Sequence, residues 1–189
     1  MIAKQLKQCF DPFLNLDIEI WENFEKYGKV KHLPKETILK EVHSIEKYLN
    51  ILLSGSGGNL IWKKNNYVCI DISFEMDFLF DFMSFIIQRP TPIEVRLFED
   101  STIFSISYQN FQKILSEREN GEKITRLVTQ GAFIDKQQQQ IDLLTKTAKE
   151  RYLELIRQKK VTTRTPLKYL ASYLGITPQS LSRIRAEKS

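Results

Sequence analysis

Residues 170–185, LASYLGITPQSLSRIR, constrain the fold of this chain more than any other segment. Two leucines spaced four residues apart can bury the inner face of a short helix, and the small side chain of Ala171 lets a second helix cross close to it. Gly175 can take the positive φ that ends a helix, and Thr177 can cap the next helix, on which Leu181 faces inward. The spacing predicts a helix-turn-helix.

The outward face of the second helix carries polar side chains of the kind that bind DNA. Gln179 and Arg183 point outward, and these residue types make bidentate contacts with adenine and guanine edges in the major groove. Residues 146–189 carry 11 Lys or Arg against 3 Glu, a net charge of +8. The whole chain is +5, so residues 1–145 sum to −3. A basic end on a mildly acidic body is typical of nucleic-acid binding by one terminus. The predicted contacts with double-stranded DNA are Thr177, Gln179, Ser180, Ser182, Arg183, Arg185, Lys168 and Arg164, with further support from Lys159 and Lys160. The alternative is a helical hairpin with an incidental basic face.

The first half of the chain has the pattern of short strands. Between residues 33 and 106, segments rich in β-branched and aromatic residues alternate with turn sequences such as Ser-Gly-Ser-Gly-Gly at 54–58 and Arg-Pro-Thr-Pro at 89–92. The expected strands lie within 36–42, 47–55, 59–64, 67–73, 93–100 and 102–107. Many short strands at close spacing predict a sandwich, a roll or a barrel.

Helical periodicity follows the strands. Ser107 can cap a helix on which Phe111 and Ile114 share one face. Further on, residues step by alternating threes and fours, which is the heptad seam of a helix that pairs with a partner helix. The predicted dimer interface consists of Ile124, Leu127, Gly131, Ile134, Gln138 and Ile141. The alternative is an ordinary amphipathic helix that packs on its own domain.

Several classes of function lack their signatures in this sequence. Two cysteines without a CxxC spacing and two histidines without HExxH are too few for a metal cluster. No Walker loop, GxGxxG or GxSxG motif is present. The longest uncharged run, residues 48–62, falls short of the ~20 apolar residues of a membrane span, and the N-terminus has no long apolar segment. We expect a cytoplasmic protein that is not an enzyme and has no metal, cofactor or membrane partner.

A β-rich half, a long helix with a dimer-type seam and a terminal helix-turn-helix resemble the Crp–Fnr family of bacterial transcription regulators. The resemblance rests on YLNILLSGSGGNLI (48–61), LFEDSTIFSISYQNFQKIL (97–115) and TPLKYLASYLGITPQSLSRIR (165–185). The last segment is similar to the short terminal motif of members from Bacteroidetes-type bacteria. The resemblance implies a β-roll that senses a small molecule, a long helix that pairs two subunits, and a second motif helix that enters the major groove.

The chain departs from the cyclic-nucleotide-binding members of this family. Those members carry Phe-Gly-Glu and then Arg, a small residue and Ala, which hold the ribose and the cyclic phosphate. Here the first segment reads Phe-Glu-Met-Asp at 74–77, and Thr91 stands where the phosphate-binding arginine is expected. Asp77 and Asp81 add repulsion toward an anion. We therefore expect neither cyclic AMP nor cyclic GMP to be the effector. The iron–sulfur branch of the family needs four cysteines, and this chain has two.

The same segment contains a row of aromatic residues. Phe74, Phe78, Phe82 and Phe85 are spaced for one face of a short helix, which predicts either core packing or an apolar ligand pocket. The candidate pocket residues are Phe74, Glu75, Phe78, Phe82 and Thr91.

Taken together, the sequence predicts an α+β fold that combines a β-roll of the double-stranded β-helix or jelly-roll type with a long helix and a small all-α domain. The expected domains are a cyclic-nucleotide-binding-like β-roll (1–115), a dimerisation helix (116–145) and a helix-turn-helix domain without a wing (146–189). The expected function is a homodimeric transcription regulator controlled by a partner or by a small-molecule effector other than a cyclic nucleotide. The alternatives are a β-roll module that binds a ligand or protein but not DNA, and a metal-dependent enzyme on a similar barrel.

Overall fold

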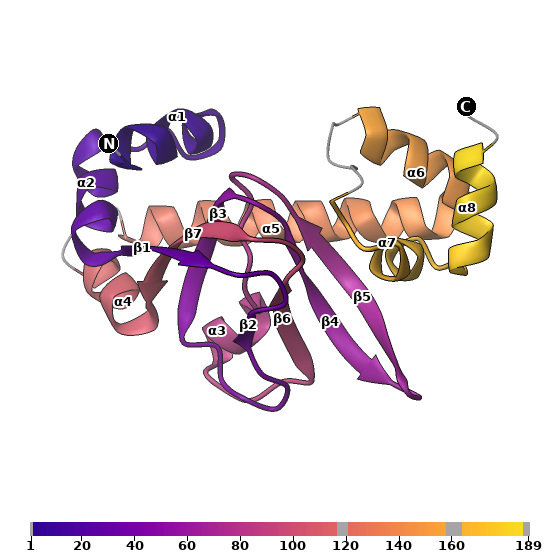
Figure 1. Cartoon of the computed structure of the whole chain (residues 1–189). Helices are drawn as coiled ribbons and strands as arrows, with labels where there is room; N and C mark the ends of the chain where they lie inside the picture. Colours follow the sequence, from indigo (N-terminus) through magenta and orange to yellow (C-terminus); the bar gives the residue numbers. More distant parts are fainter. Residues whose placement is uncertain (1, 117–120, 158–163, 187–189) are drawn as a thin grey trace.

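The computed structural model describes residues 2–116, 121–157 and 164–186 (Figure 1). Within these ranges two helices come first, seven short strands interrupted by one short helix follow, and five helices end the chain. The helices are α1 (Ile2–Leu14), α2 (Ile18–Tyr27), α3 (Phe82–Ile87), α4 (Tyr108–Ser116), α5 (Gly121–Thr145), α6 (Ala148–Arg157), α7 (Leu167–Tyr173) and α8 (Pro178–Ala186). The strands are β1 (Lys29–Leu33), β2 (Ile38–Lys40), β3 (Tyr48–Ser54), β4 (Gly57–Lys63), β5 (Asn66–Ser73), β6 (Ile93–Leu97) and β7 (Ser101–Ser107).

The strands form two antiparallel sheets. One sheet has the order β1-β7-β3 and the other has the order β2-β6-β4-β5. Leu52 and Ile103 of the first sheet meet Val95 and Leu97 of the second in a buried apolar cluster. The strand segments predicted from the sequence correspond to β2 through β7. The predicted α+β fold with a β-roll is confirmed.

Two helices and one strand precede the part of the chain for which we predicted strands. α1 and α2 lie at one end of the roll, beside α4 and the beginning of α5 (Figure 1). Their apolar faces enter the largest buried cluster through Leu6, Phe10, Ile20 and Trp21. The Phe10 ring stacks on Trp21 with 5.6 Å between ring centroids. The N-terminal helices therefore close one end of the roll with aromatic packing.

The aromatic segment 74–85 is not one helix, so the prediction of a single aromatic helix face is wrong. β5 ends at Ser73, and α3 begins only at Phe82. The intervening residues form turns, which Asp81 ends by accepting a hydrogen bond from the Ser84 backbone N–H (3.1 Å) as the N-cap of α3. Several local hydrogen bonds hold these turns. Because the turns interrupt the segment, too few consecutive residues take the α conformation for the aromatic rings to share one helical face.

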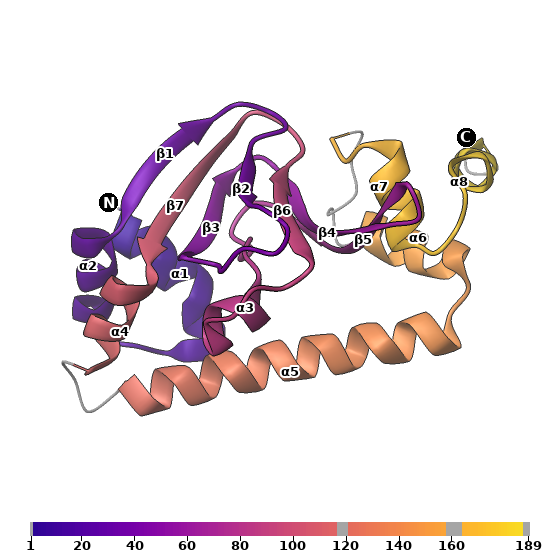
Figure 2. The same cartoon turned by 90° about the horizontal axis from the view of Figure 1, so that it is seen from below.

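The long helix α5 carries the chain from the roll to the C-terminal helices. It begins near α4, runs along the body of the molecule and leads to α6, α7 and α8 at the opposite end (Figure 2). The predicted cap of the preceding helix is confirmed, because Ser107 Oγ accepts a hydrogen bond from the Asn110 N–H (3.2 Å). None of the helices in the described parts of the chain is long and apolar enough to cross a membrane.

Candidate nucleic-acid interface

The turn between α7 and α8 has the backbone that the sequence predicts. Gly175 lies at φ +69°, in the left-handed region. Its N–H donates to Ser172 O (2.9 Å), and the N–H of Ile176 donates to Ala171 O (3.0 Å). These two bonds form a Schellman motif, which satisfies carbonyls at the end of α7. A Cβ at position 175 would have only Arg151 Nη2 within 4 Å, at 3.8 Å, so there is room for a side chain. Glycine is required here because of its positive φ.

The second helix of the motif is also capped and packed as predicted. Thr177 Oγ1 accepts a hydrogen bond from the Ser180 N–H (3.2 Å), and Pro178 is the first residue of α8. Leu170, Leu174 and Leu181 are fully buried. They form one cluster with Ala171 and with Tyr152 from α6. The three C-terminal helices therefore have a small core of their own, which is the condition for presenting α8 as a rigid unit.

The outer face of α8 is polar and open to solvent. Gln179, Ser182 and Arg183 are exposed. Thr177 and Lys168 are exposed as well, and Ser180 and Arg185 are partly exposed. Ser182 Oγ donates to Pro178 O (3.0 Å). Gln179 and Arg183 therefore lie near the N-terminus and in the middle of α8 and are open to solvent.

Arg164 does not belong to this face. Its Nε donates to Glu99 Oε1 (2.8 Å), and its Nη1 donates to Glu75 Oε2 (3.2 Å), so its guanidinium lies between two carboxylates of the β-roll. Partial burial acts to raise the pKa of the Glu75 carboxyl, but the hydrogen bonds from Arg164 lower it on balance. The structure therefore does not bring Arg164 to the exposed face of α8, and its contact with DNA stays a prediction. Lys159 and Lys160 lie outside the described residues.

The predicted dimer seam divides into two parts. Ile124 is 3% exposed and Leu127 is half-buried, and both pack in the cluster that α1, α2 and α4 build, so Ile124 belongs to the core of its own chain. Gly131, Ile134, Gln138 and Ile141 are all exposed.

Beyond its first turns, α5 bears a stripe of exposed apolar side chains. We call it the α5 stripe, and its members are Phe133 (68% exposed), Ile134 (64%), Ile141 (44%) and Leu144 (77%). At 100° per residue these four positions fall within about 100° of one another on the helix. Lys136 and Gln139, which contact β5 and α7, lie on the other side of α5. The free apolar face is therefore shifted toward the C-terminal half of the predicted seam.

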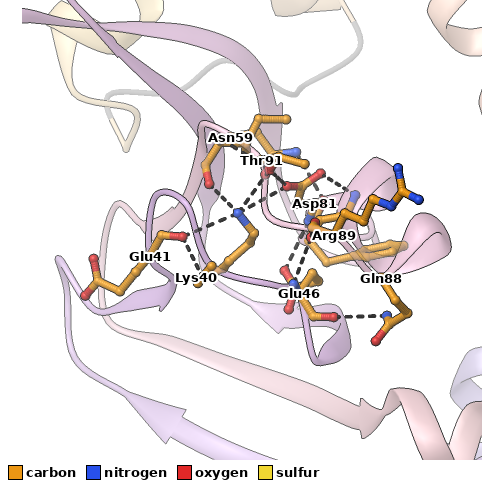
Figure 3. A network of polar contacts seen from close by, with 12 residues as sticks. Lys40, Glu41, Glu46, Asn59, Asp81, Gln88, Arg89 and Thr91 are labelled. Carbon is orange, nitrogen blue, oxygen red and sulfur yellow. Dashed lines mark hydrogen bonds and ion pairs between the residues drawn. The ribbon is translucent and has the colours of Figure 1, made fainter.

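The interior of the roll holds a buried ion pair where the sequence comparison placed the phosphate-binding segment (Figure 3). Lys40 Nζ lies 3.2 Å from Asp81 Oδ2, and both side chains are almost fully buried. The Lys40 ammonium also donates to Ile93 O (2.6 Å), Thr91 Oγ1 (3.1 Å) and Glu41 O (3.3 Å). Thr91 in turn donates a short hydrogen bond to Asp81. Thr91 is thus a partner of an internal ion pair.

A third buried charge lies beside this pair. Glu46 accepts hydrogen bonds from the backbone N–H of Asp81 (3.1 Å) and of Tyr48 (3.1 Å). Burial raises the pKa of the Glu46 carboxyl to about 7, although these hydrogen bonds and the charge of Lys40 act to lower it. Near neutral pH this carboxyl is therefore divided between its protonated and ionised forms.

Two of the remaining candidate pocket residues, Phe78 and Phe82, pack against the largest buried cluster, where both contact the ring of Phe80. Phe78 stacks on Phe10 with 5.0 Å between ring centroids, and Phe82 packs on Phe80 at 5.9 Å. Phe74 is buried, whereas Glu75 is exposed and turns toward Arg164. The turns of residues 74–81 set these positions, and local patterns of apolar residues do not reveal those turns.

The two-sheet roll, the long helix and the terminal helix-turn-helix define the fold of Crp–Fnr regulators. Solved structures with this fold include the c-di-GMP-responsive global regulator CLP of Xanthomonas campestris, with 14% identity over 90% of this chain and 91% of that chain, and a TM-score of 0.67. FixK2 of Bradyrhizobium japonicum is 14% identical over 85% of this chain and 83% of its own, with a TM-score of 0.71. A transcriptional regulator of the Crp/Fnr family from Eubacterium rectale is 16% identical over 95% and 87%, with a TM-score of 0.65. No family model and no curated protein sequence matches the chain. The resemblance inferred from the sequence is confirmed at the level of the fold.

Proposed function

We propose that this chain is a sequence-specific DNA-binding transcription regulator of the Crp–Fnr type. The observation that carries the proposal is a complete helix-turn-helix, with a buried core of its own and a Gly175 turn, that leaves the polar face of α8 exposed. Two of the solved structures with the same fold are named as regulators. The exposed basic and amide side chains of α8 suit a polyanionic partner with hydrogen-bonding edges.

In this proposal α8 is the recognition helix. Arg183 contacts a guanine edge, and Gln179 contacts an adenine edge, because these side chains form bidentate hydrogen bonds with those bases. Lys168 contacts the phosphate backbone, which carries no sequence information. The flanking contacts are Thr177, Ser180, Ser182 and Arg185.

The proposed regulator is a homodimer that pairs through the α5 stripe of two copies. Phe133 and Leu144, each about two-thirds exposed or more, would bury their apolar surface against the second copy. A two-fold dimer reads two half-sites about 34–36 Å apart, so the dimer fixes which DNA sequences both recognition helices can reach together.

We place the regulator in the cytoplasm and assign it no enzymatic activity. Its input is a small-molecule effector other than a cyclic nucleotide, or a protein partner of the β-roll. Thr91 supports the exclusion of a cyclic nucleotide, because this uncharged side chain stands where a phosphate-binding arginine is expected and is bonded to the internal pair of Lys40 and Asp81.

Selection of bound sequences from a random pool of duplex DNA tests the proposal. The expected result is one enriched motif with two-fold symmetry, together with an affinity that falls steeply as salt concentration rises. A verified dimer that enriches no motif at low ionic strength would contradict the proposal and favour the β-roll binding module without DNA binding.

A further inference from the structure

One sheet of the roll ends in a strand that the helix-turn-helix covers. In the order β2-β6-β4-β5, β5 pairs with β4 on one side, and no strand of the described residues pairs with it on the other. An edge strand presents unpaired backbone N–H and C=O groups, which proteins leave to solvent or cover with another element. Here α7 packs along β5, and the two elements come from residues about a hundred positions apart in the sequence (Figure 2).

Side chains of α7 and α5 satisfy the free edge of β5. Ser172 Oγ accepts the Cys69 N–H (3.0 Å) and donates to Tyr67 O (3.4 Å), so one hydroxyl serves two backbone groups of the strand. From α5, Gln139 Nε2 donates to Ile70 O (3.3 Å) and to the hydroxyl of Tyr173 (3.1 Å). These bonds replace those that a neighbouring strand would make, and they require α7 to lie at one position along β5.

A buried tyrosine of α7 is anchored in the sheet. Tyr169 is 1% exposed, and its ring stacks on Phe98 with 4.9 Å between centroids and 19° between ring planes. It also meets Tyr67 edge-on at 6.2 Å. Tyr169 forms a buried cluster with Leu60, Cys69 and Phe98 of the roll, whereas the core of the helix-turn-helix is a separate cluster around Leu170. The ring therefore contributes to the contact between the two units rather than to the folding of the helix-turn-helix itself.

Charged pairs close the contact on two sides. Arg164, just before α7, lies between Glu75 and Glu99 of the roll. On α5, Lys136 Nζ lies 2.6 Å from Asp71 Oδ2. We call the whole contact of α7 and Arg164 with the roll the β5 dock. The two ion pairs of Arg164 in this dock are partly exposed and each adds little, so the aromatic anchor and the edge hydrogen bonds dominate.

We propose that the β5 dock holds the helix-turn-helix in one fixed orientation on the β-roll, and that Tyr169 and Arg164 are the residues that position α8. The dock leaves Gln179 and Arg183 exposed, so it orients the recognition helix without covering it. This inference rests on the proposed function, because in a dimer the orientation of each unit sets the spacing of the two recognition helices. A change in the roll that reaches β5 then alters DNA affinity through this contact.

Spin-label distance measurements test the dock without DNA. Labels on Glu22→Cys in α2 and Ala186→Cys in α8 report the orientation, since both positions are exposed. Cys9 is replaced by serine. Cys69 is replaced by alanine in every variant, because it lies in the cluster that Tyr169 covers and would become accessible to the label when the dock opens. Dilution of labelled protein into an excess of unlabelled protein restricts the signal to distances within one chain.

The parent should give one narrow distance distribution, and Tyr169→Ala should give a broad one. Tyr169→Phe is the matched control: it keeps the ring, and the hydroxyl it removes makes no hydrogen bond within the described residues. Arg164→Gln should raise the undocked fraction by about two- to tenfold, and Arg157→Gln, at an exposed arginine of α6, should leave it unchanged. A distribution for Tyr169→Ala as narrow as the parent's would overturn the proposal, because the chain connection alone would then set the orientation.

A DNA-binding experiment distinguishes the loss of the dock from damage to the helix-turn-helix itself. The probes are a duplex carrying the motif enriched from the random pool and a duplex carrying one half of it. Tyr169→Ala should weaken binding to the full site by about tenfold or more and leave binding to the half-site nearly unchanged. Only the full site requires both recognition helices of the dimer to bind at once, at a fixed distance from each other. Equal losses on both duplexes would overturn the proposal. If the parent enriches no motif, the proposed function fails, and the distance distributions still decide whether the dock exists.

Discussion

The buried pair of Lys40 and Asp81 gives a quantitative prediction about stability. Lys40→Met should leave the Asp81 carboxylate buried beside an apolar side chain, and breaking a buried pair in this way costs about 3–5 kcal/mol of unfolding free energy. Asp81→Asn keeps an oxygen that can accept the Ser84 N–H, but it leaves the Lys40 ammonium without its carboxylate. We expect a cost of about 2–4 kcal/mol for that change.

The double variant should be much less destabilised than the sum of the two single variants. It contains no buried charge at these positions, and its main cost is the Ile93 carbonyl that loses the Lys40 donor, about 1–3 kcal/mol. The two single costs together reach roughly 5–9 kcal/mol, so the coupling between the two positions should be about 2 kcal/mol or more.

Urea unfolding of the parent, the two single variants and the double variant measures this coupling. The Lys7–Asp11 pair of α1 is the matched control, because it is about one-third exposed and four residues apart, and its coupling should be only about 0.3–0.5 kcal/mol. Additive costs for Lys40→Met and Asp81→Asn, within about 0.5 kcal/mol, would show that the two side chains are not paired inside the roll and would refute the reasoning.

Four further predictions concern pH, assembly, DNA and ligands. Because burial raises the pKa of Glu46 from its ordinary 4.5 to about 7, ionisation opposes folding, and the unfolding free energy should fall by roughly 3 kcal/mol as pH rises from 4.5 to above 7. Glu46→Gln should remove this dependence of the unfolding free energy on pH, as measured by urea unfolding at a series of pH values. A dependence that persists in the variant would show that another group causes it. Ile134→Lys should shift a dimer to monomer in light scattering, whereas Leu143→Lys, about 180° away on α5, should not; an unchanged dimer would remove the α5 stripe from the interface. Arg183→Ala should cost about 1–3 kcal/mol on the selected duplex and relax preference at one base position per half-site, and equal weakening on all sequences would make it a phosphate contact. Calorimetry should show cyclic AMP and cyclic GMP binding no more tightly than millimolar, and micromolar affinity for either would contradict our interpretation of Thr91.

Much of the fold follows from local patterns in the sequence. The strands β2 to β7 are rich in β-branched or aromatic residues, several of them alternate, and turn residues separate them, so their existence could be predicted without knowing their partners. The helix-turn-helix could be predicted residue by residue, because its glycine, its cap and its buried leucines are all local requirements. The helices α1 and α2 were missed, although Leu6 and Phe10, and Ile20 and Phe24, have the four-residue spacing that predicts a buried helical face.

The seam on α5 shows what periodicity leaves open. Regular spacing predicts that a helix has an apolar face, but it does not say which element covers that face. Ile124 and Ile134 belong to the same heptad pattern, yet Ile124 packs under α1 and α4, and Ile134 is exposed. The difference comes from the N-terminal helices, which bury only the first turns of α5.

Local sequence patterns could not predict which oppositely charged side chains pair with each other in the folded chain. From composition alone Arg164 has the features of a DNA contact, because it lies in the most basic part of the chain. The fold places Glu75 and Glu99 beside it across 89 and 65 positions of sequence. A guanidinium held by two carboxylates is electrostatically compensated and can attract a phosphate only by giving up those bonds. The net charge of a segment therefore overstates the charge that it offers to DNA, and the DNA affinity of this chain should depend more on the exposed α8 than on the full +8 of its C-terminal part.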